Sequence, residues 1–302
     1  MSGSFELEPF DSSRRGAYLA LLGKAWGGGA MGGESFDWWF DNNPAGSLRS
    51  VAVREGLVVG AAGHSLARLV VDGHEQLAQF SVHAVTAPEA RGLGIFRALE
   101  RRHEEQGQEQ GSACALAFAS APTRPLFLEP LGWTQIDRRR VWARPLPFGR
   151  RGWRALERFE AQHEAVYAEQ ARLLRNHVIR DGRYLNWRYV DSPREYRLLE
   201  AGGGGFAVVG FTRRRGLRLA LLMELAARHE DVDTLLRGAL AAARGAATLL
   251  AVPSPSLPRK RLALRGFLPT TYRLDFMGKG LSQPLDDRSD AWTVSFGDTD
   301  FF

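Results

Sequence analysis

The residues best suited to chemistry lie in one stretch, 82–99, where a predicted strand, two closely spaced glycines and a predicted helix follow one another. Gly92 and Gly94 flank Leu93 directly after Arg91. Glycine tolerates positive φ and lets the backbone approach a ligand closely. The first N–H groups of a helix lack intrahelical partners and carry the positive end of the helix dipole. A glycine turn that leads into a helix therefore predicts an anion site, with phosphate as the fitting ligand.

The same residues exclude two common phosphate-binding loops. A Walker loop ends in Lys followed by Ser or Thr, and no such pair is present in this stretch. A dinucleotide fingerprint requires a third glycine where Arg97 stands. An ordinary strand, turn and helix with a glycine cap is the alternative that the residues leave open.

The order Arg91-Gly92-Leu93-Gly94-Ile95, with Val85 and Pro88-Glu89 before it, resembles the acyl-CoA loop of the GNAT superfamily of N-acyltransferases. That family's pattern is Arg/Gln-x-x-Gly-x-Gly/Ala, and Phe96 departs from it at the last small position. The resemblance implies acetyl-CoA or another acyl-CoA as co-substrate and no metal. It implies that backbone groups at Val85 and Thr86 hold the pantetheine arm and the thioester oxygen. It further implies that a run of backbone N–H groups binds the pyrophosphate, with Arg91 adding charge; the run comprises Gly92, Leu93, Gly94, Ile95 and Phe96.

Hydrophobic periodicity predicts the strand and the helix that must position this loop. A strand is predicted over 75–86 and a helix from 95 to about 110, with alternation along the strand and a helical stripe after it. The residues expected on the inner face of the helix are Ile95, Ala98, Leu99 and Arg102. Those expected to point away are Arg97, Glu100, Arg101 and Glu104. Residues 4–147 show the GNAT order of strands, helix, strand, short helix and a Leu131-Gly132-Trp133 turn.

The second half of the chain repeats the first. Trp38 and Trp187 each precede a proline by six residues. Trp38 precedes Gly132 by 94 residues, and Trp187 precedes Gly266 by 79. Because the predicted strands, helices and aromatic motifs follow the same order in both halves, the chain is interpreted as a tandem repeat rather than two unrelated domains. The segment matching the glycine loop, 226–231, lacks glycine and is acidic, so we expect the second copy to have lost CoA binding.

The base predicted for catalysis is His83. Alternation places Gln79, Ser81 and His83 on one strand face, which we expect to line a cleft while the apolar face packs on a helix. Some GNAT enzymes carry a glutamate at the position of Gln79, which cannot accept a proton, whereas imidazole exchanges protons near neutral pH. A structural histidine is the alternative, and Glu34 and Asp37 are further candidates.

The usual proton donor of the family is absent. Many members have a tyrosine four residues before the glycine of the Leu-Gly-Trp turn, and Leu128 stands there. Water or another group then protonates the leaving thiolate, or the protein is not a standard catalyst. The aromatic residues expected in an acceptor pocket or, alternatively, in the core are Trp26, Trp38, Trp39 and Phe127.

Composition sets the broad limits. The 302 residues suggest about two domains. The net charge of +6 suits an anionic ligand, and because the basic residues occur in short clusters we expect no nucleic-acid partner. The single cysteine, Cys114, lies in an apolar run and predicts a core residue. Without a signal pattern or a membrane-length apolar run, the cytoplasm is the expected location.

These observations predict a mixed α/β fold of two GNAT-like domains, each a mostly antiparallel twisted sheet flanked by helices. The expected boundaries are residues 1–147 for the CoA-binding domain, 148–280 for the degenerate one, and 281–302 for a C-terminal tail that packs on the body. The alternative for the tail is that Asp298, Asp300 or the terminal carboxylate reaches the cleft. The expected activity is transfer of an acyl group, as acetyl, to a primary amine of a small molecule or peptide. A Fem-like tRNA-dependent aminoacyl transferase and a non-catalytic acyl-CoA-binding scaffold are the alternatives.

Overall fold

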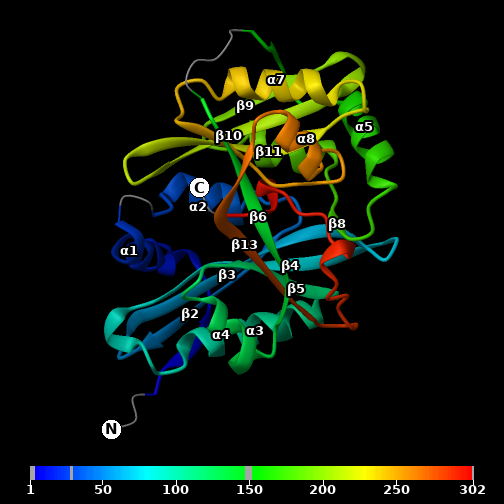
Figure 1. Cartoon of the computed structure of the whole chain (residues 1–302). Coiled ribbons are helices and arrows are strands. Elements are labelled where there is room, and N and C mark those ends of the chain that lie inside the picture. The colour runs from blue at the N-terminus through cyan, green and yellow to red at the C-terminus, as the bar shows by residue number, and fades with distance from the viewer. Residues whose placement is uncertain (1–3, 28–29, 147–151, 301–302) are drawn as a thin grey trace. The chain divides into compact units, whose positions relative to one another are not determined.

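The computed structural model describes residues 4–27, 30–146 and 152–300, which form two compact units (Figure 1). Unit 1 comprises the described residues of 1–69, 75–137 and 275–287. Unit 2 comprises those of 70–74, 138–274 and 288–300. Two strands, β6 (Thr134–Pro145) and β13 (Leu268–Gly280), are divided between the units, and the adjoining ends of β3 and β4 also belong to unit 2.

Unit 1 is a mixed sheet with helices on both faces, and its strands lie in the order β1-β2-β3-β4-β5-β13. Its remaining elements are β1 (Glu6–Pro9), α1 (Arg15–Trp26), α2 (Gly33–Phe40), β2 (Ser47–Arg54), β3 (Leu57–Val71), β4 (His74–Thr86), α3 (Ile95–Glu109), β5 (Cys114–Ala119) and α4 (Arg124–Leu131). On β3, Gly60 lies against Ile95 of α3, and Gly63 lies against Phe40 of α2. Positions three apart on a strand face opposite sides, so α3 and α2 cover opposite faces of the sheet.

Unit 2 is also a mixed sheet flanked by helices, with its strands in the order β6-β12-β11-β10-β9-β7. Its remaining elements are β7 (Arg154–Ala155), α5 (Ala161–Ala171), β8 (His177–Val178), α6 (Gly182–Leu185), β9 (Tyr196–Glu200), β10 (Phe206–Arg214), β11 (Leu217–Ala226), α7 (Val232–Ala242), β12 (Thr248–Ala251) and α8 (Arg259–Leu264). Helix α7 packs on β9, β10 and β11 around a core of leucine, valine and alanine side chains (Figure 1).

Each unit contains one parallel strand pair that separates toward its carboxyl end. In unit 1 the ladder joins Ala78–Phe80 to Cys114–Leu116, whereas β4 runs on to Thr86. In unit 2 it joins Ala220–Leu221 to Leu249–Leu250, whereas β11 runs on to Ala226. Beyond these described pairs, the facing edges carry backbone groups that a ligand or another segment of chain can satisfy.

The predicted mixed α/β class is confirmed, and the helix expected from residue 95 is α3. In unit 2, helix α5 begins directly after Glu160. Phe159 is held in place by Asn186, whose amide accepts its N–H at 2.9 Å and donates to its carbonyl at 3.0 Å. The Glu160 N–H is accepted by His163 Nδ1 at 2.9 Å, which fixes the helix start.

The expected faces of α3 are partly wrong, because Glu100 and Glu104 point inward. Glu100 is fully buried and accepts hydrogen bonds from His64 Nε2 on β3 at 3.0 Å and Ser81 Oγ on β4 at 2.9 Å. Glu104 accepts from Trp133 Nε1 at 2.7 Å and pairs with Lys279 Nζ at 2.6 Å. The two glutamates therefore fasten α3 to strands on either side of it.

His103 completes this buried network. Its ring lies 4.6 Å from that of His64 between centroids, and its Nε2 contacts Ser50 Oγ at 3.1 Å. Burial, with smaller effects of His64 and Arg102, holds its pKa well below the usual range, so the imidazole is neutral. The carbonyl of His103 accepts a hydrogen bond from Gln79 Nε2 at 2.9 Å.

We expect Glu100→Ala to lower the free energy of unfolding by about 3 kcal/mol, because His64 and Ser81 would lose their shared buried acceptor. Glu105→Ala removes an exposed carboxylate from the same helix and should change stability by less than about 0.5 kcal/mol. Urea denaturation of both variants measures the difference, and equal effects would show that the network does not hold α3.

Candidate functional site

The loop between β4 and α3 has the backbone of an anion site. Gly92 and Gly94 adopt φ values of 82° and 81°, a region that favours glycine. The Gly94 carbonyl accepts the Ala98 N–H at 3.0 Å, which is the first hydrogen bond of the helix. The N–H groups just before Ala98 have no acceptor within the helix. A Cβ placed on Gly92 would meet no atom within 4 Å, so the space beside the loop is open.

The side chains of the loop divide between solvent and core. Arg91 and Leu93 are exposed, whereas Ile95 is buried against β3. Phe96 packs on Phe127 of α4, with ring centroids 5.2 Å apart. Packing on α4 accommodates the bulky Phe96 at the position where the family pattern has a small residue. Ile95 can thus serve a ligand only through its backbone.

The strand positions predicted for the acyl arm, Val85 and Thr86, lie where β4 and β5 have separated. The chain then turns toward the loop, and the Ala87 N–H donates to the Val59 carbonyl at 2.8 Å. The structure thus brings the strand end and the glycine loop together in unit 1. Backbone donors and acceptors at a strand edge can hold an extended arm by hydrogen bonds.

His83 does not share a face with Gln79 and Ser81, so the alternation predicted for β4 is wrong at this residue. Gln79 and Ser81 contact α3, and so the polar face packs on a helix. His83 has φ of 52°, which breaks the alternation. Its ring contacts Trp39 and Phe40 of α2, each with ring centroids 6.1 Å apart.

Tyr18 holds this bend and was missed by the sequence analysis. Its hydroxyl donates to the His83 carbonyl at 3.0 Å, and the ring is fully buried. Burial raises the phenol pKa far above its usual value, so the group stays protonated. The hydrophobic spacing of α1 indicates that Tyr18 is buried, but the sequence does not show which carbonyl it reaches.

The other predicted candidates have different surroundings. Asp37 forms a two-point ion pair with Arg15, at 2.8 Å for both contacts. Trp26 is 47% exposed and lies against His83, with ring centroids 6.4 Å apart. Trp38 is buried and packs on Trp39.

The remaining expected site groups lie elsewhere. Phe127 is buried in a cluster with Trp133, and Leu128 beside it is partly buried and offers no proton donor. Glu34 is exposed in the first turn of α2. Asp298, expected near the cleft, pairs with Arg180 within unit 2 at 2.6 Å. The terminal carboxylate at residue 302 lies outside the described residues.

Comparison with known proteins supports the fold. No family model and no curated protein matches the sequence. A GCN5-related N-acetyltransferase from Kribbella flavida is similar in structure, with a TM-score of 0.67 and 17% identity over 93% of this chain and 72% of that one. One from Anabaena variabilis has a TM-score of 0.67 and 14% identity over 92% and 73%. Eis1 from Mycobacterium abscessus has a TM-score of 0.58 and 16% identity over 92% and 74%.

The chain therefore has the fold of the GCN5-related N-acetyltransferases, as the glycine loop predicted. At these identities the likeness shows the fold alone. Among the described residues, no helix combines the length and the apolar character needed to cross a bilayer.

Cys114 is buried on β5, and burial raises its thiol pKa to about 12. Because thiolate is the reactive form, we expect no labelling of the folded protein by 5,5′-dithiobis(2-nitrobenzoic acid) at pH 8. One thiol should react in guanidinium chloride. Rapid labelling of the folded chain would contradict the buried position.

Proposed function

We propose that the protein is an acyl-CoA-dependent N-acyltransferase that moves an acetyl group to a primary amine. The observation that carries the proposal is the junction of two features in unit 1. The open glycine loop begins α3, and the separated end of β4 leads into that loop. An anion site beside a free strand edge suits a molecule with a pyrophosphate and an extended amide-bearing arm.

In this mechanism the loop and the strand bind acyl-CoA as a substrate. N–H groups from Gly92 to Phe96 hold the pyrophosphate, with Arg91 adding positive charge. Backbone groups of Val85 and Thr86 hold the pantetheine arm and polarise the thioester oxygen. Binding of both substrates in one complex brings the amine to the thioester carbon.

The chemical step is direct attack by a neutral amine. Its lone pair forms the C–N bond, the carbonyl oxygen takes up negative charge, and collapse of that adduct breaks the C–S bond. His83 accepts a proton from the amine, since imidazole exchanges protons near neutral pH. Water protonates the departing thiolate, because Leu128 stands where the family has tyrosine.

Unit 2 supports the further proposal of a tandem architecture with a single CoA site. It contains its own separating parallel pair, β11 and β12, followed by α7. The connection between β11 and α7 contains His229, Glu230 and Asp231 instead of glycines. Carboxylates at this position repel phosphate, so unit 2 would bind no CoA.

A non-catalytic acyl-CoA-binding protein is the second candidate. The buried amide of Gln79, which donates to the His103 carbonyl, replaces a glutamate base, and Leu128 replaces an acid. A Fem-like transferase is less favoured because the glycine loop in unit 1 is intact. The two predictions below separate binding from catalysis.

We expect Gly94→Glu to weaken acetyl-CoA binding at least tenfold in calorimetric titration, because a carboxylate would meet the phosphates at the helix start. Gly111→Glu is the matched control: it adds the same charge at the other end of α3 with φ of 78°, close to the 81° of Gly94. Similar affinity of both variants, or no binding by the wild type, would overturn the proposed CoA site.

We expect His83→Ala to lower transfer to a primary amine by a factor of about 10² to 10⁴ at pH 7 while acetyl-CoA affinity is kept. A panel of primary amines, with detection of released CoA thiol, measures the rate. His74→Ala, an exposed histidine on the same strand, should keep full activity. Unchanged transfer by His83→Ala would exclude it as the base, and absence of transfer by the wild type would favour the binding protein.

A further inference from the structure

A hollow lies within unit 2, at the end of β11 where it has separated from β12. The space open to the centres of water-sized molecules is about 60 Å³. At roughly 10–15 Å³ per water, this volume holds about four to six heavy atoms. The polar side chains that line it include those of Tyr167, Gln170, His177, Arg180, Glu224 and Ser295.

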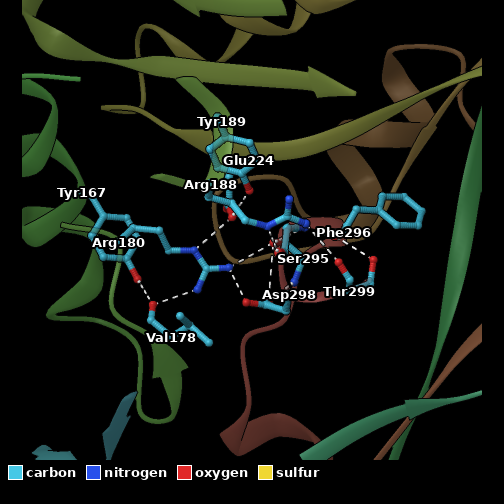
Figure 2. Close-up of polar contacts among 11 residues, drawn as sticks. Tyr167, Val178, Arg180, Arg188, Tyr189, Glu224, Ser295, Phe296, Asp298 and Thr299 are labelled. Carbon is cyan, nitrogen blue, oxygen red and sulfur yellow. Dashed lines mark hydrogen bonds and ion pairs between the residues drawn. The ribbon is translucent and has the colours of Figure 1, made fainter. Parts of the chain in front are cut away.

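The C-terminal segment Thr293–Ser295 forms one wall of this hollow and is fastened by buried charges. Figure 2 shows the Arg180 guanidinium between Glu224 and the segment that carries Ser295 and Asp298. Arg180 contacts Glu224 Oε1 at 3.0 Å, Ser295 Oγ at 3.1 Å and Asp298 Oδ1 at 2.6 Å. Its Nη1 donates to the Val178 carbonyl at 2.8 Å (Figure 2). The guanidinium of Arg180 is therefore held by hydrogen bonds to both sides of the wall.

Two other lining groups are not satisfied. His177 is only 3% exposed, and its Nδ1 has no hydrogen-bond partner among the described residues. Burial lowers the pKa of His177 to about 4, so the imidazole is neutral at pH 7. Gln170 Oε1 is likewise buried without a partner in the described chain. Buried polar atoms without partners are costly. Gln170 Oε1 requires a hydrogen-bond donor, and His177 Nδ1 accepts one as well when the ring proton lies on Nε2.

The charges around the hollow specify the donor. Glu224 accepts on Oε1 both from Arg180 and from Tyr189 Oη at 2.8 Å, which leaves Oε2 able to accept among the described groups. Glu224 and Asp298 both pair with Arg180, and burial raises the pKa of Glu224. A further cation beside Oε2 would favour the ionised form of Glu224. The rest of the wall is apolar and includes Phe206, Leu222 and Val252.

We propose that this hollow binds a small primary ammonium ion with a short aliphatic chain. Its N–H groups would donate to Gln170 Oε1, His177 Nδ1 and Glu224 Oε2, and its chain would lie against the apolar wall. This site belongs to unit 2 and needs neither the glycine loop nor acyl-CoA. The proposed amine site can therefore be tested independently of the proposed transferase activity.

The test is titration of the full chain with n-butylammonium chloride, without CoA, followed by ligand-observed NMR. We expect saturable binding in the millimolar range, at least tenfold tighter than that of butan-1-ol, and no saturable binding of butanoate. Equal binding of the alcohol and the ammonium ion, or no saturation, would overturn the proposal and indicate a water-filled hollow.

Two conservative variants locate the site. Gln170→Leu and His177→Phe keep side-chain bulk and remove one acceptor each, so each should weaken butylammonium binding about fivefold. Gln162→Leu, an exposed change on the same helix as Gln170, is the matched control and should bind like the wild type. Gly94→Glu should also bind like the wild type. Loss of amine binding in Gly94→Glu, with no effect of the Gln170 and His177 variants, would place the amine in unit 1 and overturn the proposal.

Discussion

The candidate site in unit 1 depends on how firmly α3 is held against its sheet. The N–H groups at the start of this helix are useful to an anion only if they stay aimed at one place. Glu100 joins α3 to β3 and β4, and Glu104 joins it to Trp133 and to Lys279 of β13. Charged groups buried with good hydrogen bonds fix geometry more than they add net stability. The glycine loop is thereby kept in register with the end of β4.

The bend at His83 is the second constraint. A positive φ at a residue with a Cβ costs about 1–2 kcal/mol, and here the Tyr18 hydrogen bond and the contacts with Trp39 and Phe40 offset it. The bend moves the imidazole from the α3 side of the sheet to the side of α1 and α2. On that side the imidazole is separated from the buried network under α3.

The two units use the same strand arrangement in different surroundings. In unit 1 the separated strand end leads to two glycines with positive φ, whereas in unit 2 the corresponding connection is acidic. The C-terminal segment of the chain lines the unit 2 hollow, with Asp298 paired to Arg180 (Figure 2). A phosphate-bearing ligand is thus expected at the glycine loop of unit 1, and a small cation is expected in the hollow of unit 2.

The sequence by itself determined the features that depend on local chemistry. Gly92 and Gly94 predicted the turn because few other residues tolerate its φ, and periodicity predicted the extent of α3 because an apolar stripe must face a core. Burial of Cys114 followed from its apolar neighbours.

Only the tertiary structure decided which polar residues are buried and which way they point. Glu100 and Glu104 look like surface residues on a helical projection, but partners from distant strands satisfy them. His83 left its expected face because Tyr18, 65 residues away in sequence, binds its carbonyl. His177, Arg180 and Glu224 meet Ser295 only after the chain has folded. Such contacts join residues far apart in sequence, so local spacing carries no record of them.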